Sequence, residues 1–542
     1  TLLSYERLLA FYRSGYWQDQ TIYGLAKAHA DRTPERFALR DSARRYTYGE
    51  LLAAVDAFAT DLSGRGVRPG DRVAVWLPSR VETAVALLAC SRNGFVCCPS
   101  LHRDHTVSNV VDLLERTRAV ALLTQPGYGA DGHRRDVKAA IERLPALRHL
   151  FTLAPGTSLI GLTATGDSPV SPDPNRVVYL AFTSGTTGEP KGVMHSDNTL
   201  LSNALALGAD WNIGASSVVY SLSPLSHNLG LGSLIMALSA GAEFVIHDLA
   251  KSASLVDRVL ETETTFLVGV PTHAYDLLKE LRERGMPSLG RVKGFRISGA
   301  AASKDVVAGL LELGIMPQAG YGMTEAGSHN YTLPGDDPRF VLETSGRACR
   351  GYEIRIWDQD NPDLEVPAGT VGQIGGRGAS LMLGYFDAQA TTEQAFNSAG
   401  WFMTGDVGWL DEHGYLHVTG RKKDLIIRGG HNIYPAAIEA LAMRHEAVER
   451  AVAMPVPDER LGEKVCIAVM LRPGRALTSE ELLAHLDTEG LSKYEMPEYY
   501  LALSEIPLTP SGKIRKIDLV ERIRTRSLIP TPIRWEEKAS AK

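Results

Sequence analysis

The stretch TSGTTGEPKG, residues 183–192, is rich in glycine and in hydroxyl side chains and carries one lysine, Lys191. It follows VVYLAF (residues 177–182), which has the composition of a buried strand, and precedes VMHSDNTLLSNALALG (residues 193–208), which has the spacing of a helix. Glycines let backbone N–H groups approach a ligand closely, hydroxyls donate hydrogen bonds, and the lysine adds positive charge. The stretch is therefore predicted to be a phosphate-binding loop that joins a strand to a helix.

The glycine spacing of this loop differs from that of the common nucleotide-binding P-loop. The pattern GxxxxGK[ST] is not met, because Gly185 and Gly188 are three positions apart and Gly192 follows the lysine. A different kind of phosphate loop is indicated. The alternative for the stretch by itself is a surface loop rich in Gly, Ser and Thr that binds nothing.

The composition bounds the class of protein. With 542 residues, 44% of them hydrophobic, the chain exceeds the size at which one core keeps growing, which predicts at least two domains. The formal net charge is −6 and there is no long basic run, so neither a nucleic acid nor a membrane is an expected partner. Because the sequence shows no signal-peptide pattern and no run of eighteen apolar residues, we expect a cytoplasmic protein.

The cysteines favour a reducing compartment. They form an odd set without CxxC spacing, so we expect free, buried thiols in place of disulfides or a zinc site. The set is Cys90, Cys97, Cys98, Cys349 and Cys466.

Helix and strand signals alternate along most of the chain. Thr47 and Glu50 have capping-box spacing before LLAAVDAFATDL (residues 51–62), which predicts a helix. The strand-like RVAVWLP (residues 72–78) comes next, followed by a second helical run at residues 81–94. The alternation predicts an α/β fold in which helices cover parallel sheets.

The pattern of helix and strand signals changes in the last third of the chain. Short strands with Gly and Pro turns predict a small β subdomain at about residues 340–421. After GRKKDLIIRGG (residues 420–430), the pattern indicates a small α+β unit of its own. We therefore predict a large N-terminal domain over residues 1–421, a C-terminal domain over residues 424–542, and a hinge at about 421–424.

Four further motifs, together with the phosphate loop, resemble those of the adenylate-forming superfamily, which includes acyl-CoA synthetases, aryl-acid and nonribosomal-peptide adenylation domains, and luciferases. They are GYGMTEAG (320–327), WFMTGDVGWL (401–410), GRKKDLIIRGGHNIYPAAIE (420–439) and PLTPSGKIRK (507–516). They occur in the family's order and span nearly the whole chain. The resemblance implies an AMP-forming carboxylate–CoA ligase that makes an acyl-adenylate from ATP and then a thioester.

Residues of these motifs are expected to bind ATP and Mg²⁺. Activating a carboxylate with ATP brings two anions together, so cations and oriented donors must dominate the site. By the resemblance, Thr324 contacts the α-phosphate, Glu325 holds Mg²⁺, and Asp406 and Arg421 bind the ribose. The full set of predicted ATP-binding residues is Thr183, Ser184, Gly185, Thr186, Thr187, Gly188, Lys191, Gly299, Ala300, Gly320, Tyr321, Gly322, Met323, Thr324, Asp406, Arg421 and Lys513.

The C-terminal motifs imply a domain that moves between two half-reactions. By the resemblance, the catalytic Lys513 stabilises the charge that develops between the carboxylate and the α-phosphate. Lys423 matches the hinge position about which the small domain rotates, so that the lysine leaves and a thiol enters. Gly429 and Gly430 match the segment that lines the CoA tunnel, where absent side chains leave room for a narrow thiol arm.

The acyl site is predicted from SLSPLSHNLGLG and three further segments, VGVPTH (residues 268–273), RISGAAA (residues 296–302) and QAGYG (residues 318–322). SLSPLSHNLGLG (residues 221–232) places His227 and Asn228 where aryl-acid adenylating relatives also have His-Asn. His227 either acts at the acyl site, in a catalytic or gating role, or forms a hydrogen bond within the core. Small residues that include Ser298 and Gly320 leave a slot suited to a flat or ring-shaped acid. We expect an alicyclic, aromatic or medium-chain acid, and not an amino acid, because no carboxylate is placed to bind an ammonium group.

The sequence leaves two interpretations of the thiol acceptor open. A stand-alone relative most often uses CoA, whereas the His-Asn pair also occurs in enzymes that load the phosphopantetheine of a carrier protein. An oxygen-dependent light emitter and a non-enzymatic scaffold are the remaining classes, and the sequence disfavours both. The expected partners are ATP, CoA and a small carboxylic acid, a carrier protein under the alternative only, and the sequence leaves a homodimer open.

Overall fold

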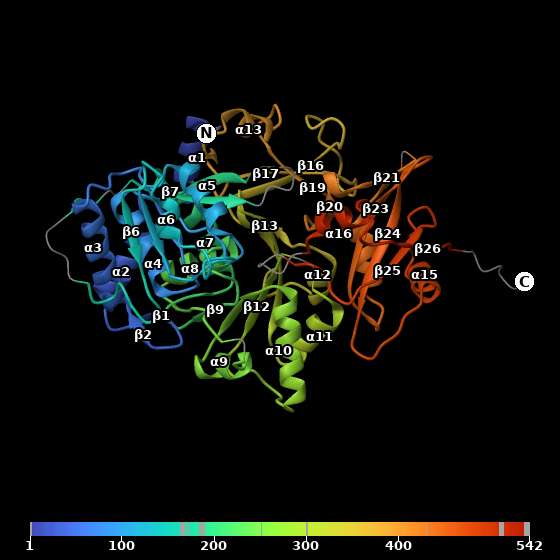
Figure 1. Ribbon diagram of the computed structural model, residues 1–542, viewed down its shortest axis with the longest axis horizontal. Helices are drawn as coiled ribbons and strands as arrows, with labels where there is room; N and C mark the ends of the chain where they lie inside the picture. Colours follow the sequence, from blue (N-terminus) through green and yellow to red (C-terminus); the bar gives the residue numbers. More distant parts are fainter. Residues whose placement is uncertain are drawn as a thin grey trace, which may run out of the picture. The chain divides into compact units, whose positions relative to one another are not determined.

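The computed structural model describes residues 3–162, 168–170, 173–183, 190–250, 252–299, 302–429, 431–508 and 514–535, the side chain of Asn432 excepted. These residues form two compact units, drawn in Figure 1. The first unit comprises Thr1–Ile354 and Gly376–Phe402, and the second comprises Arg355–Gly375 and Met403–Lys542. The hinge predicted at residues 421–424 stays a prediction.

Two mainly parallel sheets form the framework of the first unit. In the first sheet the strand order is β15 (Arg347–Ala348), β14 (Gly327–Tyr331), β13 (Met316–Met323), β12 (Gly294–Ser298), β11 (Phe266–Gly269), β9 (Val218–Ser221), β10 (Glu243–Val245), β1 (Phe37–Arg40) and β2 (Arg45–Thr47). In the second sheet it is β18 (Gly384–Tyr385), β8 (Lys191–Ser196), β7 (Val177–Thr183), β4 (Val96–Cys98), β3 (Arg72–Trp76), β5 (Ala121–Thr124) and β6 (His149–Thr152).

The central strands of both sheets are parallel, and antiparallel strands are added at their edges. Strands β13, β12, β11, β9, β10 and β1 pair in parallel, as do β7, β4, β3, β5 and β6. Strands β14 and β2 join the first sheet antiparallel, and β8 joins the second in the same way. Parallel strands need crossovers, most of which here contain a helix, and the predicted α/β class is confirmed.

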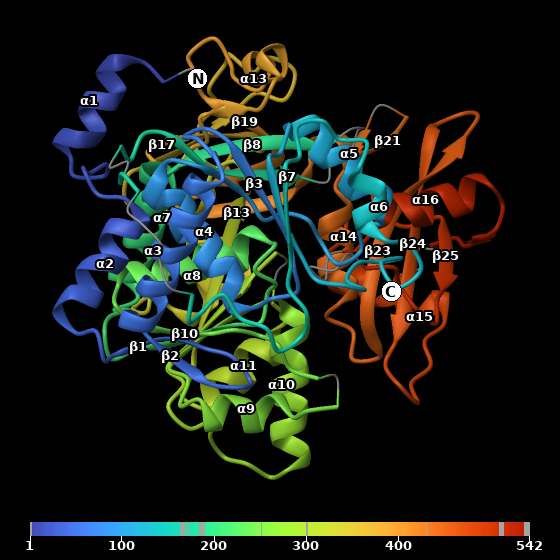
Figure 2. The same cartoon turned by 60° about the vertical axis from the view of Figure 1, so that its left-hand side comes forward.

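Helices of the first unit separate the two sheets and cover their outer faces. The helices whose buried residues share one core with both sheets are α2 (Ile22–Arg32), α3 (Tyr48–Gly64), α4 (Val81–Asn93), α7 (Asp197–Asp210) and α8 (Asn228–Ser239). The outer faces carry α5 (Val107–Thr117) and α6 (Val137–Ile141) on the second sheet, and α9 (Leu255–Glu261), α10 (Pro271–Glu283) and α11 (Lys304–Glu312) on the first. The remaining helices are α1 (Tyr5–Arg13), α12 (Pro338–Glu343) and α13 (Gln389–Gln394). Figure 2 shows α2, α3, α4 and α8 gathered between the strands.

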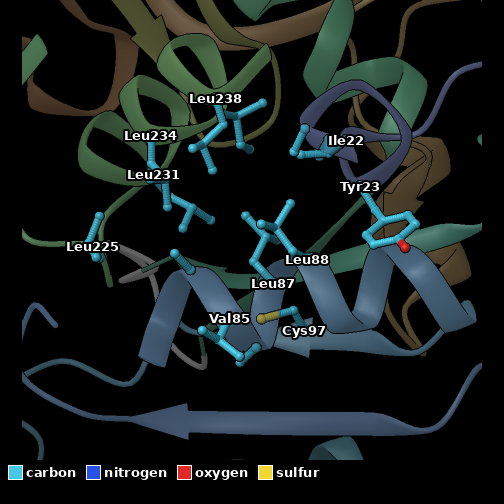
Figure 3. Packing of buried hydrophobic residues seen from close by; sticks show 14 of the residues in the cluster. Ile22, Tyr23, Val85, Leu87, Leu88, Cys97, Leu225, Leu231, Leu234 and Leu238 are labelled. Atoms are coloured by element: carbon cyan, nitrogen blue, oxygen red, sulfur yellow. The ribbon is translucent and has the colours of Figure 1, made fainter. Parts of the chain in front are cut away.

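The packing between α4 and α8 explains why these helices are apolar around most of their surface. Every residue of α4 is buried, because helices lie on one side of it and the second sheet on the other. In Figure 3, Leu87 and Leu88 of α4 face Leu231 and Leu234 of α8, and α2 closes the side of the cluster. A buried leucine contributes about 1.5–3 kcal/mol of transfer free energy, so this layer is a main source of stability.

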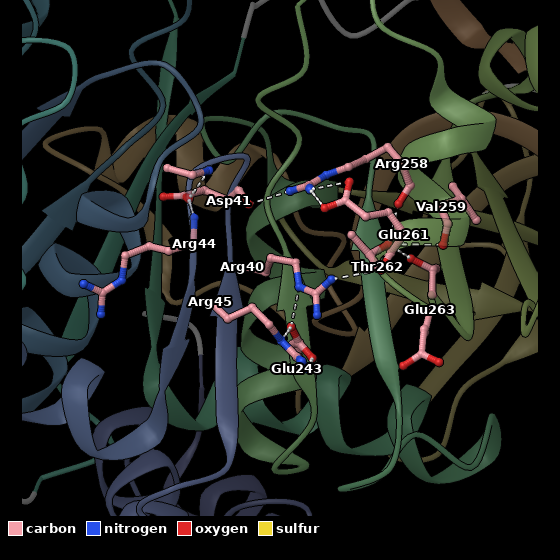
Figure 4. Close-up of polar contacts among 12 residues, drawn as sticks. Arg40, Asp41, Arg44, Arg45, Glu243, Arg258, Val259, Glu261, Thr262 and Glu263 are labelled. Atoms are coloured by element: carbon pink, nitrogen blue, oxygen red, sulfur yellow. Dashed lines mark hydrogen bonds and ion pairs between the residues drawn. The ribbon is translucent and has the colours of Figure 1, made fainter.

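A network of arginines and carboxylates ties the edge strands of the first sheet together. Glu243 is 5% exposed; its Oε1 accepts a hydrogen bond from Arg40 Nε at 3.0 Å and another from Arg45 Nε at 2.9 Å. Figure 4 shows Arg40 and Arg45, from neighbouring strands, converging on this one carboxylate. Two cations offset the cost of burying Glu243, so the network fixes β1, β2 and β10 together.

The second unit contains a second pair of sheets. One has the strand order β16 (Tyr352–Trp357), β17 (Gly372–Gly378), β19 (Phe402–Leu410) and β20 (Leu416–Arg421), and the division between the units crosses its first three strands. The other has the order β22 (His431–Ile433), β21 (Ile426–Arg428), β24 (Gly462–Leu471), β25 (Tyr499–Ala502) and β26 (Thr531–Pro532), with β23 (Val448–Asp458) also paired to β24. Its helical elements are the 3-10 turn η1 (Lys422–Asp424), α14 (Pro435–Ala442), α15 (Ser479–Thr488) and α16 (Lys516–Arg524).

Strands β23 and β24 present alternate residues to two small cores. Val465 and Ile467 pack with α14 and α15, whereas Cys466 and Ala468 pack with α16. Successive side chains of a strand point to opposite faces, so this sheet is covered on both sides. The α+β unit predicted for the C-terminal part of the chain is confirmed.

Several local predictions agree with the structure. Helix α3 begins with the capping box predicted from Thr47 and Glu50, whose side chain and backbone groups bond reciprocally. All five cysteines are free and buried, and burial raises the pKa of Cys349 and Cys466 to about 12. Among the residues described, no helix has the length and apolar character needed to cross a membrane.

Candidate active site

The predicted phosphate loop joins two antiparallel strands. β7 ends at Thr183, β8 begins at Lys191, and these two residues are paired across the ladder. The prediction that the loop leads directly into a helix is therefore wrong. Residues 191–196 bond to β7 on one side and to β18 on the other, and this pairing overrides their helical tendency. Helix α7 begins only after Ser196, whose side chain caps it.

Most of the loop itself lies outside the described residues. The predicted ATP-binding residues that fall there are Ser184, Gly185, Thr186, Thr187 and Gly188. The two strand ends that carry Thr183 and Lys191 nevertheless fix where the loop starts and stops.

Lys191 and Glu325 lie on two sides of one tyrosine. The Nζ of Lys191 is 5.0 Å from the ring centroid of Tyr385, within cation–π distance. The hydroxyl of Tyr385, a residue only 6% exposed, donates a hydrogen bond to Oε1 of Glu325 at 3.0 Å. Burial and the nearby carboxylate raise the pKa of Tyr385, so its hydroxyl stays a donor at any physiological pH. A cation and a carboxylate are thus held at the end of the phosphate-loop hairpin.

Thr324 and Glu325 lie in a tight turn between β13 and β14, where Met323 pairs with Gly327. The carbonyl of Thr324 is 2.7 Å from Nε2 of His195, and the carbonyl of Glu325 accepts from the N–H of Met382 at 2.7 Å. Burial lowers the pKa of His195 to about 4, so the ring is neutral, and donation to a carbonyl requires the proton on Nε2. The neutral histidine therefore anchors the turn without adding charge to it.

The glycines before this turn allow two strands to approach closely. A Cβ on Gly322 would lie 2.1 Å from the carbonyl oxygen of Gly327, so a larger residue cannot fit there without moving the backbone. Tyr321 packs edge-on against His329, with ring centroids 4.9 Å apart. Met323 packs partly buried against the core. The sequence GYGM thus brings Thr324 and Glu325 to the end of β13.

The next strand of the sheet adds Ser298 and Gly299. Ser298 ends β12, and its hydroxyl donates to the carbonyl of Gly320 at 3.1 Å. Gly299 has φ +91°, a conformation that favours glycine, and it turns the chain after the strand. Ala300 lies outside the described residues.

A pocket opens between α7, α8 and the first sheet. Its atom-free space is about 510 Å³, a figure that includes the open solvent at its mouth. Leu200, Leu207 and Leu229 give it an apolar wall, while Asn228 and Arg296 add polar groups. Of the predicted acyl-binding residues, Asn228 lines this pocket.

His227 lies next to the pocket as the N-cap residue of α8. Its Nδ1 accepts a hydrogen bond from the backbone N–H of Leu229 at 3.2 Å. This contact matches the second of the two roles predicted from the sequence, a histidine bonded within the fold. A gating or catalytic role stays a prediction.

Asp406 and Arg421 are brought together within the second unit. They pair across β19 and β20, and Nε of Arg421 is 3.4 Å from Oδ1 of Asp406. The carboxylate side chain is 11% exposed and the arginine side chain 44% exposed. A carboxylate that faces partly outward beside a cation suits a sugar diol, as the resemblance predicts for these two residues.

The residues predicted to act in the second half-reaction are only partly described. Lys423 is exposed in η1. Gly429 has φ +58°, and its N–H donates to the carbonyl of Leu461 at 2.7 Å. Gly430 and Lys513 lie outside the described residues.

The metal role of Glu325 can be tested against the donors near it. Within the described ranges, no three or more His, Cys, Asp or Glu side chains are grouped so that they could hold a metal ion. Mg²⁺ often takes one or two protein carboxylates and completes its shell with phosphate and water oxygens. A single carboxylate held by Tyr385 fits that kind of site, and would not fit a metal bound by protein side chains alone.

Two residues of these sites, His195 and Tyr385, were not predicted from the sequence. They meet their partners across long separations, 129 residues between His195 and Thr324 and 60 residues between Tyr385 and Glu325. Sequence spacing carries no signal for such contacts. Arg296 belongs to the segment RISGAAA (residues 296–302) that was predicted to contribute to the acyl pocket, and it lines the pocket.

The sequence was compared with protein families and with known proteins. The model of the AMP-binding enzymes matches residues 26–386, and the model of their C-terminal domain matches residues 437–513. A medium-chain fatty-acid–CoA ligase of Escherichia coli is 30% identical over 534 residues, with 96% of this chain and 94% of the ligase covered. A salicyl-AMP ligase / salicyl-S-ArCP synthetase of Mycobacterium tuberculosis is 30% identical over 537 residues, covering 96% of this chain and 93% of its own.

Solved structures give the same result for the fold. The crystal structure of ATP-bound MatB from Rhodopseudomonas palustris superimposes with a TM-score of 0.82 at 28% identity, covering 93% of this chain and 99% of that one.

Proposed function

The chain belongs to the family of AMP-binding enzymes, and from that premise we propose that it joins a carboxylic acid to coenzyme A at the expense of ATP. The similarity to a medium-chain fatty-acid–CoA ligase over nearly the full length of both chains supports an acid–CoA ligase. The mostly apolar wall of the pocket supports an alicyclic, aromatic or medium-chain acid.

The cluster of Lys191, Tyr385 and Glu325 is the observation that carries this proposal. It places a cation and a carboxylate beside the ends of the glycine- and hydroxyl-rich loop. A nucleoside triphosphate with Mg²⁺ needs both, because its phosphates repel an attacking carboxylate unless their charge is offset. We assign Lys191 to the phosphates, and Thr324 to the α-phosphate.

In the first half-reaction the acid's carboxylate oxygen attacks the α-phosphorus of ATP, and pyrophosphate leaves. Lys191 offsets the charge of the leaving phosphates, and His195 holds the Thr324 turn so that the threonine hydroxyl can donate to the α-phosphate. Glu325 would hold Mg²⁺, which would supply positive charge to offset that of the phosphates. Lys513 supplies a further positive charge at the attacking carboxylate, and Asp406 with Arg421 orients the ribose.

In the second half-reaction the thiol of CoA attacks the acyl carbonyl carbon of the adenylate, and AMP leaves. No covalent enzyme intermediate is needed, which agrees with the burial of all five cysteines. Burial raises the pKa of a thiol and keeps it in its unreactive form. We assign Gly429 and Gly430 to the path of the pantetheine arm, and Lys423 to the hinge.

A carrier protein is the alternative thiol. The salicyl-AMP ligase similarity and the His227-Asn228 pair favour it, because that relative's name includes transfer to an aryl carrier protein. CoA stays the preferred acceptor because a medium-chain fatty-acid–CoA ligase matches nearly the full chain and CoA is the usual acceptor of stand-alone relatives.

The test is product analysis by mass spectrometry. The protein is incubated with ATP, Mg²⁺, CoA and a panel of benzoates, cyclohexanecarboxylates and C4 to C12 fatty acids. We expect an acyl-CoA together with AMP, in amounts that fall sharply in Lys191→Met and stay unchanged in Lys293→Met, an exposed lysine away from the cluster.

Two other outcomes decide against parts of the proposal. If the acyl group of the adenylate passes only to a phosphopantetheinyl carrier protein, the acceptor is the carrier protein and not CoA. An absence of AMP and of pyrophosphate exchange with every acid would refute the ligase.

A further inference from the structure

Arg296 is a buried cation with unused hydrogen-bonding capacity. It lies in the middle of β12 and is 1% exposed. Its Nη1 donates to Oε1 of Gln318 at 2.9 Å, but Nε and Nη2 have no hydrogen-bond partner among the described residues. An arginine carries five N–H donors, so most of its donor capacity is unmet.

Among the residues that the structure describes, no carboxylate forms an ion pair with this guanidinium. Apart from Gln318, the groups that act on its charge are Tyr331, whose ring centroid is 5.7 Å from Cζ, and the thiol of Cys349. Burial lowers the pKa of Arg296 to about 10, which still leaves it protonated at neutral pH. Leaving a buried charge without a counter-ion is costly, so a partner for these donors has to come from outside the described residues.

The position of Arg296 links it to the pocket beside α7 and α8. Arg296 lines that pocket, and of its lining residues it carries the one permanent charge in the described part of the chain. Leu200, Leu207 and Leu229 supply apolar walls nearby. The guanidinium packs directly against Gly320, where a Cβ would come within 2.7 Å of Nη2, so the glycine allows the arginine to take this position.

We propose that Arg296 recognises a second oxygen acceptor on the acid, a carboxylate or a ring or chain carbonyl, at the end remote from the carboxylate that is activated. This inference rests on the proposed acid–CoA ligase and narrows its substrate class. An acid with an apolar body and a distal oxygen fits both the leucine walls and the guanidinium. A plain fatty or alicyclic acid leaves Nε and Nη2 unpaired and is the poorer substrate, because a site built to hydrogen-bond discriminates against analogues that lack the group.

The experiment compares matched acids on the wild-type protein. The sets are octanoate, 7-oxooctanoate and octanedioate, and cyclohexanecarboxylate with its 4-oxo and 4-carboxy derivatives. We expect kcat/KM for acyl-CoA formation to be about 10- to 100-fold higher for the oxygen-bearing members of each set. A higher value for the diacids assigns a carboxylate to Arg296, and a higher value for the oxo acids assigns a carbonyl.

Variants then attribute the preference to Arg296. Arg296→Met should remove the preference for oxygen-bearing acids and raise the relative activity on the plain acids. Arg296→Lys should keep a preference for the diacids only, because a lysine keeps the positive charge but lacks the planar set of N–H donors of a guanidinium. Arg258→Met is the matched control, since Arg258 is also buried but bonds to Asp41 and Glu261 in the network of Figure 4. It should lose stability and keep the wild-type preference.

Direct binding of the same acids by calorimetry separates this inference from the proposed function. If no acid is turned over, the ligase proposal fails, yet tighter binding of the oxygen-bearing acids to the wild type than to Arg296→Met still supports the inference. Equal or better binding and turnover of plain acids by the wild type would overturn it and leave Arg296 a structural residue.

Discussion

Replacing Tyr385 by Phe tests whether the cluster at the phosphate-loop hairpin positions a metal ligand. The change removes the hydroxyl that donates to Oε1 of Glu325 at 3.0 Å and keeps the ring beside Lys191. A hydrogen bond to a charged group is worth about 1.5–3 kcal/mol, which corresponds to roughly 10- to 100-fold in an equilibrium constant. Loss of a partner that orients a metal ligand costs a similar factor in metal affinity. We therefore expect the Mg²⁺ concentration for half-maximal activity to rise by about 10- to 100-fold.

The assay is ATP–pyrophosphate exchange at fixed ATP over a range of free Mg²⁺. The matched control is Tyr46→Phe, which removes another buried tyrosine hydroxyl, one that donates to a carboxylate oxygen of Asp41 at 2.9 Å. Both variants should lose about 1–2 kcal/mol of unfolding free energy, but only Tyr385→Phe should shift the Mg²⁺ titration. A titration that stays within about twofold of wild type would refute the role of this hydrogen bond, and an unchanged titration in Glu325→Gln as well would remove Glu325 from the metal site.

Four further outcomes are expected. Lys513→Ala should abolish adenylate formation and leave thioester formation from supplied acyl-adenylate largely intact; equal loss of both half-reactions in rapid-quench experiments would contradict its role. Lys423→Pro, which fixes φ in η1, should spare pre-steady-state adenylate formation and slow thioester formation, and a parallel fall in both would argue against a hinge. Acidification from pH 6.5 to 4 should lower the free energy of unfolding, because burial lowers the pKa of His102, His195, His273 and His329 to about 4 and the unfolded chain binds protons that the folded chain does not. Asp197, whose pKa burial raises to about 7, takes up about one proton in the folded chain over the same pH range and so opposes this trend. Urea titrations that show no net loss of stability on acidification would contradict the prediction that these histidines are buried and neutral. Glu243→Gln should cost about 3–5 kcal/mol in urea unfolding because it leaves Arg40 buried without a full counter-charge, whereas Asp31→Asn, in an exposed pair with Lys27, should cost under about 1 kcal/mol.

The accuracy of the sequence predictions depends on whether the deciding interactions are local. Helix α3 and its capping box were predicted because Thr47 and Glu50 bond to each other's backbone within one turn. The helix expected directly after the phosphate loop was wrong at its start, because residues 191–196 pair with strands from distant parts of the chain. The pairing of Asp406 with Arg421 follows from a hairpin between neighbouring strands, which is again a short-range feature.

The sequence by itself determined the α/β class, the ordered set of glycine, threonine and lysine motifs, and the residue types that a phosphate-binding site requires. These features depend on local composition and spacing, because helix capping, turn chemistry and hydrophobic periodicity act over a few residues. The tertiary structure alone decided that Tyr385 meets Glu325, that His195 holds the Thr324 turn, and that Arg296 lines an apolar pocket without a counter-ion. Those contacts depend on which strands pair and which helices pack between them, and no short-range pattern in the sequence encodes such long-range choices.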